Sequence, residues 1–68
     1  MKTREWINIE QGMKTEVWKY GEQYHVVTTD MDSNNIIRAT FIYFDEASAI
    51  NKAKQIIGQI TMQEYLTI

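Results

Sequence analysis

The chain has 68 residues, no cysteine, no proline and a formal net charge of −2 at pH 7. This length makes residues 1–68 a single domain, and the lack of cysteine excludes a disulfide framework and a thiolate zinc site. With 44% hydrophobic and 24% charged residues, the composition is typical of a folded domain and not of a disordered one. A scaffold and an enclosed pocket hardly fit in this length, so we expect no enzyme and no cofactor.

The charge pattern argues against nucleic acid as a partner. Seven Lys and Arg residues are scattered among nine Asp and Glu residues, whereas phosphate binding draws on clustered basic side chains. The basic N-terminus is not followed by the apolar segment of a signal peptide, and no apolar run approaches the ~18 residues that span a membrane. We therefore expect a cytoplasmic protein without a membrane partner.

The first part of the chain indicates a β-hairpin. Residues 1–10 mix charges with Trp6, and a short strand, a helical turn or a segment clasped over the core all remain open. Residues 14–20 and 23–29 are rich in Val, Thr, Tyr and Trp, which favour strands. Gly21 and Glu22 between them suit a two-residue type II′ loop, which would pair Tyr20 with Gln23.

The second part indicates a strand followed by a helix. Asp and Asn residues over 30–35 predict a turn, and 36–44 is the strongest strand signal. Apolar residues at 50, 53, 57 and 60 have the spacing of one helix face, with Asp45 as N-cap and Gly58 just past the end. For 59–68 we favour a second helix, although a strand or a continuation of the first helix also fits.

These elements predict an α+β fold: a three-stranded antiparallel meander packed against one C-terminal helix (β-β-β-α), with a short extra element possible at either end. Pairing Tyr20 with Gln23, and Met31 with Ile36, assigns each side chain to a face. One face carries Thr15, Val17, Tyr24, Val26, Thr28, Ala39, Phe41 and Tyr43. The opposite face carries Glu16, Trp18, Tyr20, His25, Val27, Ile36, Arg38, Ile42 and Phe44.

Both faces are apolar, yet one long helix is available to cover them. The first face has the smaller residues and is expected to receive the helix, while the second has the composition of an interface. We predict interface residues Trp18, Tyr20, His25, Val27, Arg38, Ile42 and Phe44. A homodimer through this face or through an edge strand is the favoured occupant. Cover by the N-terminal segment and tail, or binding of a heterologous protein or small molecule, are the alternatives.

Candidate chemical sites have simpler structural explanations. His25 is the only histidine, so one chain cannot make an ordinary transition-metal site. Asp30-x-Asp32-x-Asn34 begins like an EF-hand loop, but the sixth and twelfth positions lack the required Gly and Glu, which predicts a plain turn. No catalytic, metal or cofactor-binding residue is predicted.

The strand order, the hairpin 19–24 (KYGEQY) and the strand-to-helix junction 44–47 (FDEA) resemble the YopT-type family of small prophage proteins of Gram-positive bacteria. The resemblance covers roughly residues 13–58 and implies three strands, one helix, a homodimer and no catalytic residues. We therefore expect a non-enzymatic protein–protein interaction module, encoded by a phage or mobile element. The alternative function is a nucleic-acid-binding regulator that uses its sheet, with Arg38 as the main basic contact.

Overall fold

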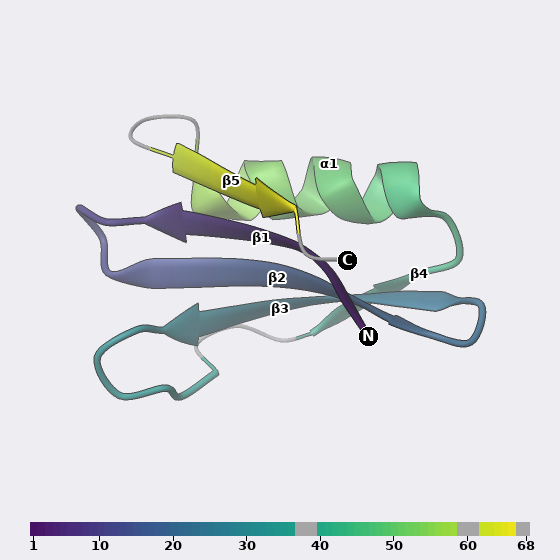
Figure 1. The fold of residues 1–68 in the computed structure, drawn as a ribbon, viewed down its shortest axis with the longest axis horizontal. Helices are drawn as coiled ribbons and strands as arrows, with labels where there is room; N and C mark the ends of the chain where they lie inside the picture. The colour runs from purple at the N-terminus through teal and green to yellow at the C-terminus, as the bar shows by residue number, and fades with distance from the viewer. Residues whose placement is uncertain (37–39, 59–61, 67–68) are drawn as a thin grey trace.

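An antiparallel sheet with one helix across it makes up the computed structural model, which describes residues 1–36, 40–58 and 62–66 (Figure 1). The elements are β1 (Lys2–Asn8), β2 (Met13–Tyr20), β3 (Gln23–Asp30), β4 (Phe41–Tyr43), α1 (Glu46–Ile57) and β5 (Met62–Leu66). The strand order is β4-β3-β2-β1-β5. The α+β class is therefore confirmed, and the predicted meander is present as β2-β3-β4 with one further strand beyond it from each end of the chain.

The central hairpin has the predicted register. β2 and β3 pair from Tyr20 opposite Gln23 to Met13 opposite Asp30. Gly21, in the two-residue loop, has a φ of 62°, a left-handed conformation that a primed hairpin turn requires and that glycine adopts without strain. Local turn chemistry therefore fixes the alignment of the two longest strands.

The third strand is shorter than predicted. The pairs from Tyr24–Tyr43 to Val26–Phe41 follow the predicted alignment, but Ile36 bridges Thr29 and not Met31. Two residues of β3 lie between these positions, against four (37–40) on the other segment, so one regular ladder cannot join them. The shift originates in the turn, where the Asp30 N–H donates to the Asn35 carbonyl at 2.9 Å.

Both ends of the chain add strands to the same sheet edge. β1 pairs with β2, and β5 pairs with β1 from Arg4 opposite Leu66 to Asn8 opposite Met62. The favoured helix in the tail is therefore wrong for 62–66, while 59–61 and 67–68 lie outside the described residues. Gly58, with a φ of 84°, ends α1, and the backbone groups along the second edge of β1 then offer the tail hydrogen-bond partners.

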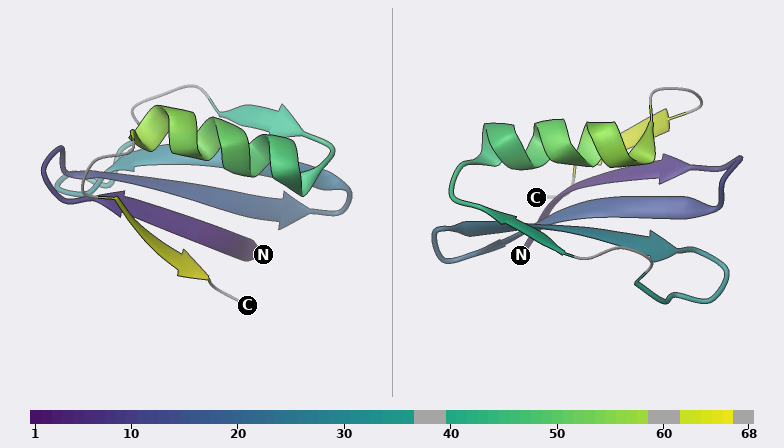
Figure 2. Two further views of the ribbon diagram at one scale, coloured as in Figure 1. Left: turned by 90° about the horizontal axis from the view of Figure 1, so that it is seen from above. Right: turned by 180° about the vertical axis from the view of Figure 1, so that it is seen from behind.

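The helix begins and ends close to the predicted residues and covers the predicted face. The Asp45 carboxylate caps it by accepting from the Ser48 N–H at 2.8 Å. The buried stripe is Ala49, Ala53 and Ile57, where the sequence had suggested Ile50 in place of Ala49. Small side chains at two of these positions let α1 approach the sheet, and Figure 2 shows it lying across one face.

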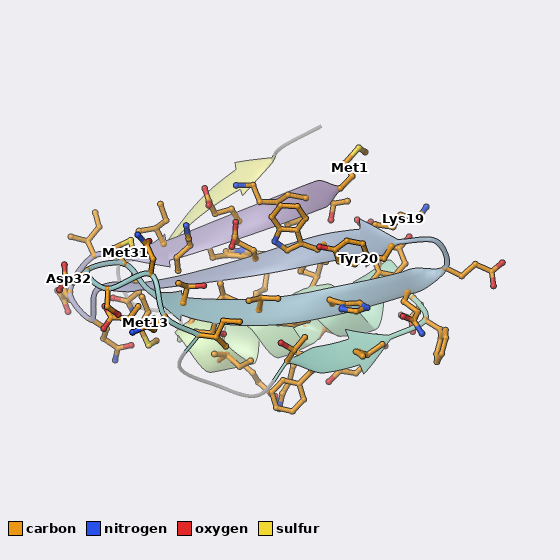
Figure 3. All side chains as sticks on the ribbon, turned by 90° about the horizontal axis from the view of Figure 1, so that it is seen from below. Met1, Met13, Lys19, Tyr20, Met31 and Asp32 are labelled. Atoms are coloured by element: carbon orange, nitrogen blue, oxygen red, sulfur yellow. The ribbon has the colours of Figure 1, made fainter. Side chains whose placement is uncertain are left out.

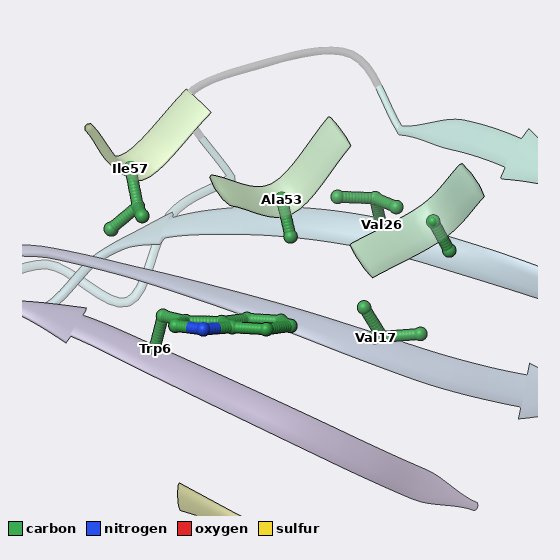
Figure 4. Close-up of a cluster of buried hydrophobic side chains, with 6 residues drawn as sticks. Trp6, Val17, Val26, Ala53 and Ile57 are labelled. Atoms are coloured by element: carbon green, nitrogen blue, oxygen red, sulfur yellow. The ribbon is translucent and has the colours of Figure 1, made fainter. Parts of the chain in front are cut away.

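The core lies between α1 and the sheet (Figure 4). It consists of Trp6, Val17, Val26, Ala49, Ala53 and Ile57. Two polar pairs lie inside it: the Thr15 and Thr28 hydroxyl oxygens are 3.2 Å apart, and the Asn8 amide donates to the Ile57 carbonyl at 3.0 Å. The buried Trp6 indole Nε1 has no hydrogen-bond partner among the described residues. The predicted helix-side set is confirmed for the described strand residues, while Ala39 lies outside them.

Candidate protein interaction surface

The sheet face opposite α1, here called the open face, carries the second set of alternating side chains. Trp18 is the register partner of His25, and His25 is the partner of Ile42, so the three share this face. Figure 3 looks at the open face from below. β1 and β5 extend the sheet sideways (Figure 1), so these two strands do not fold over this face as the alternative of a covering N-terminal segment and tail would require, while residues 67–68 lie outside the described part of the chain.

Four side chains near the β2–β3 loop form what we call the aromatic cluster: Trp18, Tyr20, His25 and Ile42. The Trp18 and Tyr20 rings stack with centroids 6.2 Å apart, and the Tyr20 and His25 rings meet edge to face at 4.9 Å. His25 Nε2 lies 3.1 Å from Gln23 Oε1. Tyr20 and Ile42 are 53% and 51% exposed. The cluster is thus a preformed, partly hydrated apolar surface.

Three charged side chains, Lys2, Glu5 and Glu16, occupy the β1 side of the open face. This group is here called the lysine trio after its single lysine. Glu5 and Glu16 are direct register partners, and Lys2 Nζ lies 3.2 Å from a carboxylate oxygen of each. Burial lowers the pKa of Lys2, but hydrogen bonds to Glu16 and Glu5 and their charges outweigh this, so the pKa is raised. Lys2 therefore separates two carboxylates that would otherwise repel each other.

The seven predicted interface residues do not all come together. Four of them make up the aromatic cluster, and Val27 is half-buried on the same face, opposite Glu16. Phe44 is 73% exposed beyond the end of β4. It borders an open hollow of about 400 Å³, whose other walls are Lys19, Gly21, Glu22 and Tyr24. Two of these, Lys19 and Tyr24, belong to the helix-side row, so Phe44 is not part of the cluster. Arg38 lies outside the described residues.

The sequence alone did not indicate the lysine trio or the hydrogen bond from the Asn8 amide to the last turn of α1. Lys2 and Glu5 are recognisable as a surface group only once β1 is known to pair with β2. Asn8 looked like an ordinary polar residue, yet it is 4% exposed and holds the end of the helix. Lys2 and Glu5 are only three positions apart, but Glu16 and the Ile57 carbonyl lie 11 or more positions from their partners, so the sequence carries no local signal for either arrangement.

The Asp30 turn and the other candidate polar groups show no arrangement for chemistry among the described residues. Asp30 Oδ1 accepts from the Asp32 N–H at 3.0 Å, which confirms the predicted turn. In the part of the chain that the structure describes, no group of three or more His, Cys, Asp or Glu side chains is placed to hold a metal ion. No helix there is long and apolar enough to cross a membrane. The arrangement on the open face is suited to binding by stacking and apolar contact.

Comparison with known proteins identifies no relative, so the functional argument rests on the surface described above. The chain matches no protein family, no curated protein and no solved structure. The resemblance to the YopT-type family accordingly stays a prediction.

Proposed function

We propose that this chain is a small, non-enzymatic protein interaction module that forms a homodimer through the aromatic cluster of its open face. The observation that carries the proposal is the cluster itself, in which Tyr20 and Ile42 are exposed beside the partly buried Trp18 and His25. The cysteine-free composition favours a cytoplasmic location, and the resemblance stated above favours a phage or mobile element as its source.

The cluster has the chemistry of an interface centre. Trp and Tyr are enriched at the buried centres of protein interfaces, where charged residues are depleted. Here stacking already orders the Trp18 and Tyr20 rings, so little side-chain freedom remains to be lost when a partner covers them. The lysine trio beside them supplies a polar rim in which Lys2 bonds both carboxylates.

A second copy of the chain suits this surface because the cluster carries no formal charge at neutral pH. Two copies, each of net charge −2, can then meet without placing like charges in contact. The whole molecule extends 32 × 21 × 20 Å, so face-to-face packing of the sheets would bury at most roughly 1,200 Å² in total, the lower limit of specific interfaces. We expect a reversible dimer with a dissociation constant in the micromolar range.

The total exposed area argues that the dimer separates into folded monomers. The chain exposes 4355 Å², close to the roughly 4,450 Å² expected of a compact 8.0 kDa monomer. Its core is therefore complete without a partner. Substitutions on the open face can weaken the dimer while the fold remains intact.

Sedimentation equilibrium of the full chain from 1 µM to 1 mM tests the proposal. We expect the wild type to move from 8.0 kDa towards twice that mass, and Tyr20→Lys to raise the dissociation constant at least tenfold. Gln55→Lys, which adds the same charge at an exposed position of α1, is the matched control and should leave dimerisation unchanged. A wild type that stays monomeric at 1 mM, or equal effects of both substitutions, would contradict the proposal.

Nucleic-acid binding by the sheet gains no support from the described part of the open face. Lys2 is bonded there to two carboxylates, and Arg38 lies outside the described residues. It stays a prediction, for which a salt-dependent shift of a DNA probe that Arg38→Ala abolishes is the test.

A further inference from the structure

We infer that His25 lies at the two-fold axis of the homodimer, beside the partner's His25, and that acidification therefore dissociates the dimer. The inference rests on the proposed function, since it specifies the geometry and regulation of the same interface. It is carried by the position of His25 within the aromatic cluster.

His25 is the central member of the cluster. It lies on β3, between its register partners Trp18 on β2 and Ile42 on β4, and its ring contacts that of Tyr20 with centroids 4.9 Å apart. A homodimer with two-fold symmetry uses the same patch on both copies, so the residue at the centre of the patch meets its own copy. In this patch that residue is His25.

The lysine trio makes a two-fold axis closer to β1 energetically unfavourable. Glu16 is 8% exposed and bonded to Lys2 at 3.2 Å. An axis near it would bring the trio against the same three charges of the partner and strip water from all of them, which costs more than the pairs return. An axis at His25 places these charges towards the edge of the contact, away from the same groups of the partner.

None of the described side chains that face His25 is negatively charged. None would therefore stabilise a protonated His25 imidazole once the partner covers it. These side chains are Trp18 and Tyr20 from β2, Ile42 from β4 and Gln23 from its own strand. The nearest charged residues described on the face, Lys2 and Glu16, are bonded to each other. Two imidazolium rings at the axis would be desolvated and would repel each other, so the dimer requires both histidines to be neutral.

The pH dependence then follows from linkage. The monomer can bind one proton per histidine and the dimer none, so protons favour the monomer. An ordinary imidazole takes up its proton near pH 6.5. Because each dissociation exposes two imidazoles to proton uptake, linkage predicts a dissociation constant that is about 100-fold higher at pH 5.5 than at pH 7.5. Because His25 is the only histidine, this interval isolates its contribution from those of the carboxylates.

Sedimentation equilibrium at pH 7.5 and 5.5 tests the protonation step. We expect the wild type to lose about 100-fold in affinity at the lower pH, and His25→Phe, which keeps a planar ring, to dimerise with almost no pH dependence. A wild type that dimerises equally well at both values would overturn the inference while leaving the homodimer intact. A wild type that does not dimerise at pH 7.5 would instead refute the proposed function.

Thiol cross-linking tests the axis, and the cysteine-free chain makes the result unambiguous. Facing sheets pack about 10 Å apart, so a bifunctional maleimide that spans about 10 Å should join His25→Cys to its copy, whereas a direct disulfide would not reach. Lys14→Cys is the matched control on the same face: it is four residues, about 14 Å, along β2 from Trp18, so an axis that crosses the strands at His25 places it about 27 Å or more from its copy. Cross-linking of Lys14→Cys but not of His25→Cys would overturn the assignment.

Discussion

Replacing Thr15 alone by valine should cost more stability than replacing Thr15 and Thr28 together. The two residues are register partners on β2 and β3, they are 0% and 1% exposed, and their hydroxyl oxygens are 3.2 Å apart. A single valine leaves the remaining hydroxyl without this partner, in a place that water does not reach. The double substitution removes both hydroxyls and fills the space with methyl groups.

The magnitude follows from the asymmetry of buried hydrogen bonds. An unpaired buried hydroxyl costs about 1–3 kcal/mol, partly offset by about 0.8 kcal/mol for the added methyl group. Thr15→Val should therefore lower the free energy of unfolding by about 1.5 kcal/mol. The double variant should lie within about 1 kcal/mol of the wild type, which implies a coupling energy of about 2 kcal/mol between the two sites.

Urea unfolding followed by tryptophan fluorescence measures the free energy of unfolding of the wild type, the two single variants and the double variant, at a concentration where the chain is monomeric. Trp6, which is fully buried, reports on the same core. Thr40→Val, at an exposed position, is the control and should change stability by less than about 0.5 kcal/mol. Additive effects of Thr15→Val and Thr28→Val would refute the reasoning, because they would show that the two hydroxyls are satisfied independently.

Two further substitutions test the connections of β1. Asn8→Asp should destabilise the chain by about 2–3 kcal/mol in thermal or urea unfolding, which is more than Asn8→Ala should. The reason is that it replaces the amide that donates to the Ile57 carbonyl by an oxygen that this carbonyl repels. Equal losses of stability in the two variants would contradict this. Lys2→Met should cost about 1 kcal/mol at pH 7 by leaving Glu5 opposite Glu16. Since the Lys2 pKa is raised on folding, its contribution is fully present below pH 10.5 and is lost as the pH rises beyond that value, so the two melting curves should converge in alkali.

The parts of the fold that the sequence predicted correctly are those with local signals. The β2–β3 register follows from a two-residue loop that begins with Gly21, and α1 follows from Asp45 at one end and Gly58 at the other. The aromatic cluster was predicted for the same reason: once the hairpin register is set, strict alternation places Trp18 and His25 on one face. Phe44 lies beyond the end of β4, where alternation no longer assigns a side chain to a face, and its predicted part in an interface stays a prediction.

The amino-acid sequence by itself determined an α+β fold with a fixed central hairpin, a capped helix and more apolar sheet surface than the helix covers. Tertiary structure alone decided that both ends of the chain become strands, that β4 is short and that Lys2 separates two carboxylates. These features depend on backbone and charge partners far apart in the chain, which no local propensity encodes. By adding β1 and β5 at the edge of the sheet and not over its face, tertiary structure also left the aromatic cluster uncovered.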